Sequence, residues 1–540
     1  MGDDLRLTEP LSTEDCLQGR LRVVHSCGLT RELLAERTET LLSDAQKDAL
    51  ARNRLGVVPI VFLVLAAVAP VTVAIVIMPL AIGNGIGGGT PVVVAVVALA
   101  LLLFAVGYAQ MTKELVNAGG FYAIAVKSLG RPAGLITGII ATIGYNSFVA
   151  GSMGALGFFA GQVALPMLFG FEVHWYLAAS VLFVVIFLLA RSGIHVSAIV
   201  LGVALVLEVL LLLGFGIAVL VQTGFDVAAL THSFSPDVVA GGSIWIGLLL
   251  VATAFIGFEA TALFGEEAKE PRKTIPRATY LAIVLIGLVH AFGSWAVVSA
   301  IGVKDAREVA LAHLADGDLT LGLVTQYLGP VMGTTAVLLL IVSLFAAQLT
   351  FHNSAARYMF ALGRARVLPT WLSRTSANGT PRRALAVNLV FGLLIAGVFA
   401  VAAETDQEGN RLPPLVTLVP VGVGFGTLAI MIVQAIAALS IVVYFRRQRD
   451  ARWWATAVAP GIGFITLLLF SVMALLNFPL VAGSEASYVV ILPWILVAAV
   501  VGGLIYAVYL RARKPLVYEG LSRDLESFDE FSEHSTMFIE

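Results

Sequence analysis

The stretch AFIGFEATALFGEEAKEPRKTIPRA, residues 254–278, decides the fold of this chain. It closes an apolar run, carries an acid at Glu259 inside that run, and then ends in a dense block of both charges. Apolar residues that give way abruptly to charge are typical of a membrane helix returning to water. Gly257 lies in the apolar part and favours an interruption of the helix. The stretch therefore predicts a membrane-spanning helix that is broken near its middle.

Composition leads to the same class of protein. The 540 residues are 59% hydrophobic and only 13% charged, which excludes an ordinary water-soluble protein. Cys16 and Cys27 have no partners at metal-ligand spacing, so neither a disulfide framework nor a metal site is expected. The sequence contains no phosphate-binding loop, paired catalytic acids or nucleic-acid-binding patch. We therefore expect an all-α polytopic membrane protein that is not an enzyme, needs no cofactor and binds no nucleic acid.

A bilayer core requires about 20 apolar residues in a helix, and the sequence contains twelve such runs. They are residues 57–83, 91–112, 133–163, 175–191, 195–222, 243–264, 278–302, 326–362, 384–403, 415–445, 454–477 and 487–511. Residues 52–515 are therefore expected to form a twelve-helix transporter domain, with polar segments 1–51 and 516–540 outside the membrane. Residues 1–51 fit a short amphipathic helix and a disordered tail equally well.

The positions of Lys and Arg predict the orientation. Sorted by alternate loops, one face holds only Lys304, Arg307 and Arg411. The other face holds the basic clusters around Lys113, Lys269, Arg364, Arg446 and Arg511. By the positive-inside rule the basic face is cytoplasmic. An even number of spans then places both termini in the cytoplasm, on the inner side of the cell (plasma) membrane.

Two of the runs are interrupted at matching places. Pro70 lies in the middle of the run 57–83, where it lacks an amide donor and displaces the carbonyl one turn earlier. Gly257 interrupts the run 243–264. Five spans separate the start of the first run from the start of the sixth, an odd number, so the broken helices should run antiparallel, as in an inverted repeat of spans 1–5 and 6–10. The alternative is that both residues produce simple kinks.

Three stretches carry a resemblance to a known family: NAGGFYAIAVKSLGR (117–131), FIGFEATALFGEEAKEPRKTIPRA (255–278) and NSAARYMFALGRARVLP (353–369). They are similar to segments of amino acid permeases of the amino acid-polyamine-organocation (APC) superfamily. The resemblance covers about residues 52–515 and implies the LeuT-type five-plus-five inverted repeat, with spans 11 and 12 appended. It also implies secondary transport of amino acids or related amines. The chain departs from the family at APVTVA (69–74), where many relatives have Gly-x-Gly, and at Ala365 and Arg366, which replace Asp-Gly.

The predicted substrate site lies where the two breaks meet. Amides freed at the first break can take a carboxylate, and carbonyls freed at the second can take a cation. Tyr145 on span 3 is expected to form a wall, and an aromatic lid would come from Tyr145, Phe255 or Phe258. The residues predicted to bind substrate are Ala69, Pro70, Val71, Thr72, Val73, Tyr145, Ala252, Thr253, Phe255, Gly257 and Phe258.

Two acids are the candidates for coupling. Glu208 lies in the middle of the run 195–222, roughly 20 Å from either end at 1.5 Å per residue. A carboxylate there is unfavourable unless it is protonated or paired, so Glu208 either carries a coupling proton or is a permanently neutral hydrogen-bonding group. It resembles the ionisable residue that replaces the sodium site on span 5 of proton-coupled APC members. Glu259 either braces the freed amides or acts as a ligand or proton site. Hydroxyls for a sodium site would come from Ser343 and Thr350, unless these bond to their own helix.

The function that follows is secondary active transport by alternating access, with proton-coupled symport of neutral amino acids. Its partners would be an amino acid, a proton and the lipid bilayer. The alternative is an antiporter, or a polyamine or cationic amino acid carrier of the same fold, in which several acids should surround the pocket.

Overall fold

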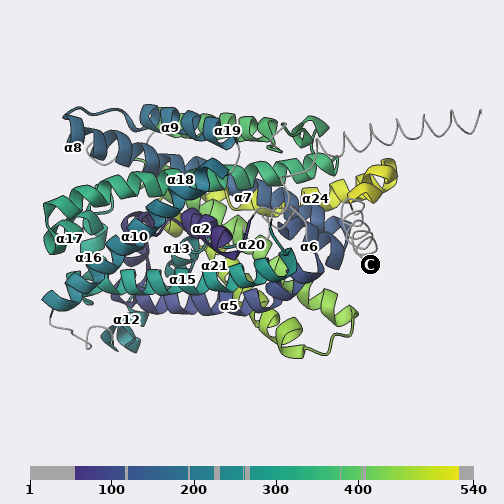
Figure 1. Ribbon diagram of the computed structural model, residues 1–540, viewed down its shortest axis with the longest axis horizontal. Coiled ribbons are helices and arrows are strands. Elements are labelled where there is room, and N and C mark those ends of the chain that lie inside the picture. The colour runs from purple at the N-terminus through teal and green to yellow at the C-terminus, as the bar shows by residue number, and fades with distance from the viewer. Residues whose placement is uncertain are drawn as a thin grey trace, which may run out of the picture.

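The computed structural model describes residues 55–115, 120–192, 195–223, 231–259, 261, 268–376, 379–402, 404–405 and 409–521, without the side chains of residues 195–201 and 240 (Figure 1). The segment 1–51 lies outside these ranges, as do parts of the motifs at 117–131 and 255–278. Within the described ranges the regular structure is helical and no strand is present. The all-α prediction is therefore confirmed for this part of the chain.

The first half of the chain, up to residue 222, contains the following elements. They are α2 (Val57–Val68), α3 (Pro70–Thr72), η1 (Val73–Ile77), α4 (Met78–Ala81), η2 (Ile82–Ile86), η3 (Gly87–Gly89), α5 (Thr90–Glu114), α6 (Gly120–Leu129), α7 (Arg131–Phe158), η4 (Phe159–Ala164), α8 (Leu165–Phe169), α9 (Trp175–Ala190) and α10 (His195–Gln222).

The second half begins with shorter helices and ends with long ones. Its elements are α12 (Pro236–Ala240), α13 (Ile244–Thr253), α15 (Pro271–Ile301), α16 (Ala306–Ala312), α17 (Leu319–Leu328), α18 (Pro330–Arg364), η6 (Thr370–Ser373), α19 (Arg382–Val401), α20 (Leu418–Arg447), η7 (Trp454–Val458), α21 (Ala459–Leu476), α22 (Phe478–Ala482), α23 (Ser487–Ile491) and α24 (Trp494–Arg513).

Nine helical stretches of the described chain are long and apolar enough to cross a membrane. One of them, Val57–Glu114, contains two of the predicted runs. Two other predicted runs correspond to shorter helices, α9 with 16 residues and α13 with 10 residues. The chain is thus a polytopic membrane protein, whereas the number twelve stays a prediction.

Burial separates central helices from peripheral ones. Of the most apolar window in Val57–Glu114, 89% is buried inside the protein, whereas only 22% is buried in Ser487–Arg513. A helix that is apolar all round and buried by protein belongs in the core, whereas one with an exposed apolar face contacts lipid. The interrupted first run therefore lies in the centre of the bundle, and α24 lies at its edge beside the C-terminal end (Figure 1).

The two interrupted runs are antiparallel neighbours. At one end the amide of Lys269 donates to the carbonyl oxygen of Leu55 over 2.7 Å, and at the other the amide of Ser243 donates to the carbonyl oxygen of Gly85 over 3.2 Å. The start of the first run therefore lies beside the end of the second, and the end of the first run lies beside the start of the second. The predicted antiparallel arrangement of the two runs is confirmed.

Glycine pairs allow other helices to approach closely. A Cβ built on Gly422 of α20 would lie 2.6 Å from the Cα of Gly151 on α7, and one on Gly426 would lie 2.8 Å from the carbonyl oxygen of Gly144. Small residues at such crossings are the usual means by which membrane helices gain contact area. Gly144 lies at this crossing of α7 and α20. The next residue along α7 is Tyr145, whose side chain is buried in the bundle.

Candidate functional site

The first break lies at Ala69. Helix α2 ends at Val68, and Ala69 takes a left-handed conformation with φ 53° and ψ 75°. The residue before a proline is disfavoured in the right-handed helical region, and Pro70 then starts α3 at the position where its missing amide does no harm. The first break is thus made by the dipeptide Ala69–Pro70, without a glycine at the joint.

The amides after this break bond to other helices. The amide of Val71 donates to Glu208 Oε2 over 3.3 Å, and that of Thr72 donates to Ser343 Oγ over 3.4 Å. In a continuous helix the amides of Val71 and Thr72 would bond to the carbonyls of Ala67 and Val68, whereas Pro70 has no amide hydrogen for the carbonyl of Ala66. Those carbonyls therefore lose their usual donors, and the positive end of a helix is directed at side-chain oxygens.

Glu208 is held at the first break by hydrogen bonds from the amide of Val71 and from the hydroxyl of Ser343. Its side chain lies on α10 with only 3% of its surface exposed, and its Oε2 also accepts a hydrogen bond of 2.7 Å from Ser343 Oγ. Ser343 lies on α18, so the carboxyl group joins three separate helices. Thr350, in contrast, donates to the carbonyl oxygen of Ala346 in its own helix. Of the two hydroxyls considered for a cation site, only that of Ser343 reaches the break.

The second break begins at Ala254. Helix α13 ends at Thr253, and the amides of residues 254–256 bond three residues back instead of four. Gly257 then has φ 121°, a conformation that side-chain-bearing residues rarely adopt. A Cβ built there would lie 3.0 Å from the Cβ of Ala67 on α2. The described part of the run 243–264, predicted as one span, is therefore a short helix followed by turns over residues 254–259, which pack against the first break.

Glu259 braces the second break. Its Oε2 accepts a hydrogen bond of 3.0 Å from the amide of Gly257, and its Oε1 accepts one of 2.7 Å from the hydroxyl of Tyr145. The hydroxyl of Tyr108 on α5 donates to the carbonyl oxygen of Glu259 over 3.1 Å. The carboxyl group is 2% exposed. Each break thus donates an amide hydrogen bond to a buried carboxyl group. The acceptor is Glu208 at the first break and Glu259 at the second.

Comparison with known proteins identifies the family. A family model described as amino acid permease matches residues 55–501. The chain belongs to the amino acid permease family. Its resemblance to APC-superfamily permeases in sequence is thereby confirmed, and it is a multi-pass membrane protein of a family of amino acid transporters.

Three relatives show how distant the similarity is. The permease is 26% identical to the branched-chain amino acid permease BcaP of Bacillus subtilis, over 77% of this chain and 84% of that protein. It is 27% identical to an uncharacterized transporter of Mycobacterium tuberculosis, over 62% of this chain and 68% of that protein. It is also 27% identical to the histidine permease HisP of Lactococcus lactis, over 37% and 42% respectively. All three names describe transporters.

The remaining predicted residues of the permease lie apart from these bonds. Ala252 and Phe255 line a small apolar cavity together with residues of α5, α20 and α21, and the Phe255 ring meets His290 edge-on at 5.8 Å. Phe258 packs edge-on against Phe104 at 6.1 Å. Thr253 shares a hydrogen bond of 2.9 Å with the hydroxyl of Thr427. Of the three aromatic residues considered for a lid, Tyr145 is the one bonded at the breaks.

A buried polar network in the permease was missed by reasoning from sequence. His352 of α18 bonds through Nδ1 to Asn388 Oδ1 of α19, and Asn388 donates to Asn146 Oδ1 of α7 over 2.8 Å. One turn along α18, Gln348 bonds to Ser152 and donates to the carbonyl oxygen of Val149. The signal was present, because an amide side chain inside an apolar span needs a partner.

The permease has no cluster suited to a metal ion among the residues that the structure describes. His290 is buried, and neither of its ring nitrogens has a hydrogen-bond partner within the described chain. The side chain of His195 lies outside the described residues. Among the described residues, Glu208 and Glu259 are the buried carboxyl groups that bond backbone amides at the breaks.

Proposed function

We propose that the protein is a secondary active transporter that moves neutral amino acids by alternating access in symport with protons. The observation that carries this proposal is the set of bonds after Ala69. Two amides at the positive end of a broken helix donate to oxygens of Glu208 and Ser343, which belong to other helices. Such amides are the usual site for a substrate carboxylate in the middle of a transporter.

The substrate is proposed to bind between the two breaks. Its carboxylate would take the amides of Val71 and Thr72, and its ammonium group would lie near the carbonyls of residues 66–68, which lack their helical donors. The buried Thr72 Oγ1 has no hydrogen-bond partner among the described residues and would donate to the same carboxylate. Tyr145 would form one wall, and Gly257 would keep the opposite side open.

Proton coupling is proposed to arise from competition for the amide of Val71. Glu208 already places a carboxyl oxygen on this amide. Protonation would remove the negative charge of Glu208 and release the amide to the substrate carboxylate, so that both cargoes bind together. Loss of the proton on the other side of the membrane would return the amide to Glu208 and expel the substrate. Glu259 would serve as the brace of the second break throughout the cycle.

Neutral amino acids are favoured as substrates for two reasons. Two relatives carry names that describe branched-chain amino acid permeases. In addition, both buried acids at the breaks already accept hydrogen bonds from the protein, which leaves fewer free carboxyl acceptor positions for a dication. A relative of Arabidopsis thaliana that is named a cationic amino acid transporter keeps cationic amino acids as the competing substrate class.

The proposed architecture completes this picture. Residues 52–515 would cross the membrane twelve times, spans 1–5 and 6–10 would form a LeuT-type inverted repeat, and spans 11 and 12 would be appended. Segments 1–51 and 516–540 would lie in the cytoplasm, with the domain in the cell membrane.

Uptake by proteoliposomes tests the proposal. Purified protein should concentrate labelled leucine when the outside is acidified, and a proton ionophore should abolish the concentration. Isoamylamine, which is leucine without its carboxylate, should compete poorly, whereas putrescine should not compete at all. Competition by isoamylamine as strong as that by unlabelled leucine would contradict the proposed substrate site, and uptake of leucine that does not respond to the pH gradient would contradict the proposed coupling.

A further inference from the structure

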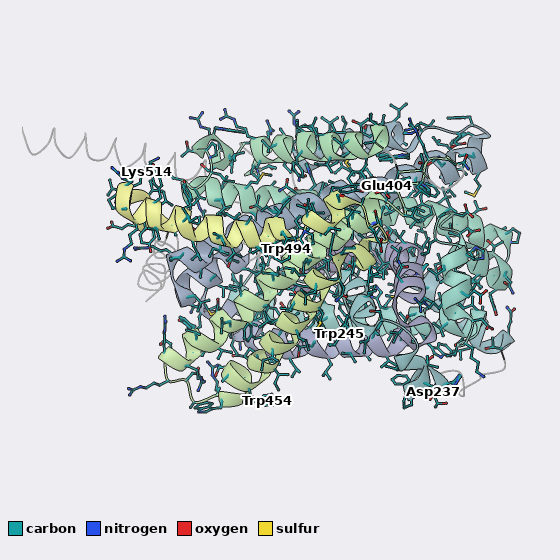
Figure 2. The ribbon with its side chains drawn as sticks, turned by 180° about the vertical axis from the view of Figure 1, so that it is seen from behind. Asp237, Trp245, Glu404, Trp454, Trp494 and Lys514 are labelled. Atoms are coloured by element: carbon teal, nitrogen blue, oxygen red, sulfur yellow. The ribbon has the colours of Figure 1, made fainter. Side chains whose placement is uncertain are left out.

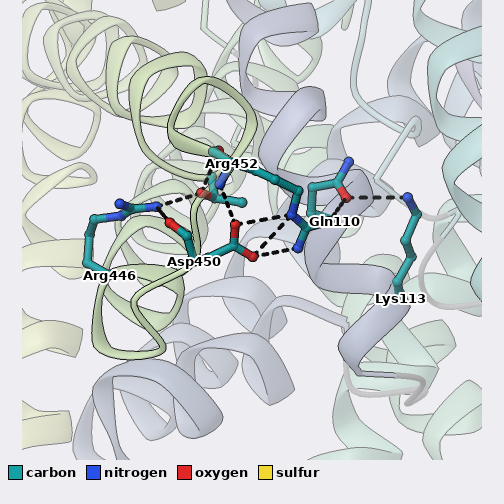
Figure 3. Close-up of polar contacts among 6 residues, drawn as sticks. Gln110, Lys113, Arg446, Asp450 and Arg452 are labelled. Carbon is teal, nitrogen blue, oxygen red and sulfur yellow. Dashed lines mark hydrogen bonds and ion pairs between the residues drawn. The ribbon is translucent and has the colours of Figure 1, made fainter.

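A cluster of cations lies at the end of the bundle where α5 and α20 finish, away from the breaks. The segments 110–114 and 446–454 together contain five Lys or Arg and two acids, a net formal charge of +3. Figure 3 shows Lys113, Arg446 and Arg452 gathered around Gln110 and Asp450. We call these five residues, with Arg449, the basic corner. Nothing in the proposed transport cycle uses it.

The bonds of the basic corner leave its positive charge largely unmatched. Arg452 holds Asp450 through Nε and Nη2 and also donates from Nη1 to Gln110 Oε1 over 3.0 Å. Lys113 donates to the same Gln110 oxygen over 3.3 Å. Two cations therefore converge on one neutral oxygen, which cannot neutralise either of them. The bonds of Arg452 use three of its five N–H donors and leave two for an anion.

The corner is also held in shape before any anion arrives. Arg446 donates to the carbonyl oxygen of Asp450 and to Thr456 Oγ1, over 2.9 and 2.7 Å, and its guanidinium lies 4.1 Å from the centre of the Trp453 ring. The hydrogen bonds from Arg452 keep the pKa of the Asp450 carboxyl below its usual value. Since Arg449 adopts φ 54°, the chain turns sharply here. Fixed arginines lose little conformational freedom when they bind a phosphate.

The surroundings place the corner at a membrane surface. Trp453 and Trp454 are 61% and 60% exposed, and Trp454 lies at the rim of the molecule in Figure 2. From there η7 and α21 expose an apolar stripe along one side. The stripe consists of Val458, Ile462, Ile465, Leu469, Val472 and Leu476. Exposed tryptophans at the end of a lipid-facing helix mark the boundary between acyl chains and headgroups.

We propose that the basic corner binds the phosphate of an anionic phospholipid headgroup, with the acyl chains of that lipid lying along the apolar stripe of η7 and α21. A lipid fits both features at once, because it carries a negative phosphate and an apolar tail on one molecule. A soluble anion would satisfy the charge of the corner but would leave the stripe without a specific partner.

Lipid titration tests the proposal on the full-length protein in a mild detergent. Phosphatidylglycerol should raise the midpoint of thermal unfolding, and native mass spectrometry should detect one retained lipid per protein. Phosphatidylcholine and inorganic phosphate should produce neither effect. A shift as large with phosphatidylcholine would overturn the proposal, and a shift as large with inorganic phosphate would assign the corner to a soluble anion instead.

Paired variants locate the effect. The double variant Lys113→Gln and Arg452→Gln should bind phosphatidylglycerol about 30-fold more weakly, because each cation near a membrane surface contributes roughly a fivefold effect. The matched control Arg511→Gln and Arg513→Gln removes the same charge from exposed positions on α24 and should bind like the parent. Arg449→Gln changes one exposed side chain and should weaken binding severalfold even if the double variant unfolds. Equal losses in the control and the corner variants would refute a specific site.

Discussion

At the scale of single residues, Glu208 is the position whose replacement separates two mechanisms. Glu208→Gln keeps the shape and the acceptor oxygen but fixes a neutral group. If protonation couples transport, the variant should exchange leucine at near the parental rate yet lose concentration driven by a pH gradient. If Glu208 only joins helices, both activities should persist. Glu308→Gln, at an exposed position, is the control and should behave like the parent in both assays.

Gly257 gives a second prediction at this scale. Its φ of 121° is strained for any other residue, and an added Cβ would press on Ala67 at 3.0 Å. Gly257→Ala should therefore lower stability by about 1–3 kcal/mol and reduce uptake, and Gly257→Val should abolish uptake.

Gly293→Ala is the matched control for Gly257→Ala. It lies within α15, where an added Cβ meets no atom within 4 Å, so stability should hold or rise slightly. Thermal unfolding and uptake of the variants should be measured together. Parental uptake by Gly257→Val would place the substrate elsewhere.

The sequence indicated these residues but not their partners. The depth of Glu208 and the glycine at 257 can be read from the apolar runs around them. The hydrogen bond between Glu208 and the amide of Val71 could not be predicted from the sequence. The two residues are 137 positions apart, and their contact depends on how α10 packs against α3. The role of Ala69 was equally hidden, since its left-handed conformation follows from Pro70 and from packing together.

At the scale of elements, the polar network of α7, α18 and α19 should hold these three helices in register. Asn388 is fully buried and bonds both His352 and Asn146. Asn388→Ala should lower the free energy of unfolding by about 1–3 kcal/mol, because two buried polar groups lose their partner. The affinity for leucine should change little, because the hydrogen bonds of Asn388 go to His352 and Asn146 and not to the residues of either break.

Asn388→Asp provides the comparison for this network. It keeps the size and an acceptor for His352 but removes the amide that donates to Asn146, so it should recover only part of the lost stability. The midpoint of thermal unfolding, with the Michaelis constant for uptake, distinguishes the outcomes. A large change in the Michaelis constant with unchanged unfolding would contradict a structural role.

Element boundaries show where hydropathy stops being informative. The run 243–264 is continuous in hydropathy, yet its helix ends at Thr253 because the chain must turn before it reaches Gly257. Likewise, the run 57–83 is continuous in hydropathy, yet it contains a left-handed joint at Ala69 and a π-helical segment at Val73–Ile77. Backbone bonds and close contacts with other helices set these features, and average hydrophobicity does not report them.

At the scale of the whole molecule, the distribution of Lys and Arg makes the orientation testable. After Cys16 and Cys27 are replaced by Ser, single cysteines can be placed at two exposed sites, Glu308→Cys and Arg449→Cys. A membrane-impermeant maleimide added to intact cells should label the first and spare the second, because the basic face is predicted to be cytoplasmic. Permeabilised cells, in which both sites should react, provide the control. Labelling in the opposite order would reverse the proposed topology.

The strained joint at Ala69 has a consequence for the energy of the whole cycle. A left-handed alanine stores roughly 1–2 kcal/mol, which corresponds to about a 5- to 30-fold change in the ratio of two conformations. A conformation in which Ala69 took right-handed helical φ and ψ angles would recover that energy. The strain at Ala69 therefore raises the free energy of the conformation described here. Ala69→Gly would remove this strain, because glycine adopts the left-handed conformation at no steric cost, and the resting protein would then spend more of its time in the conformation described here.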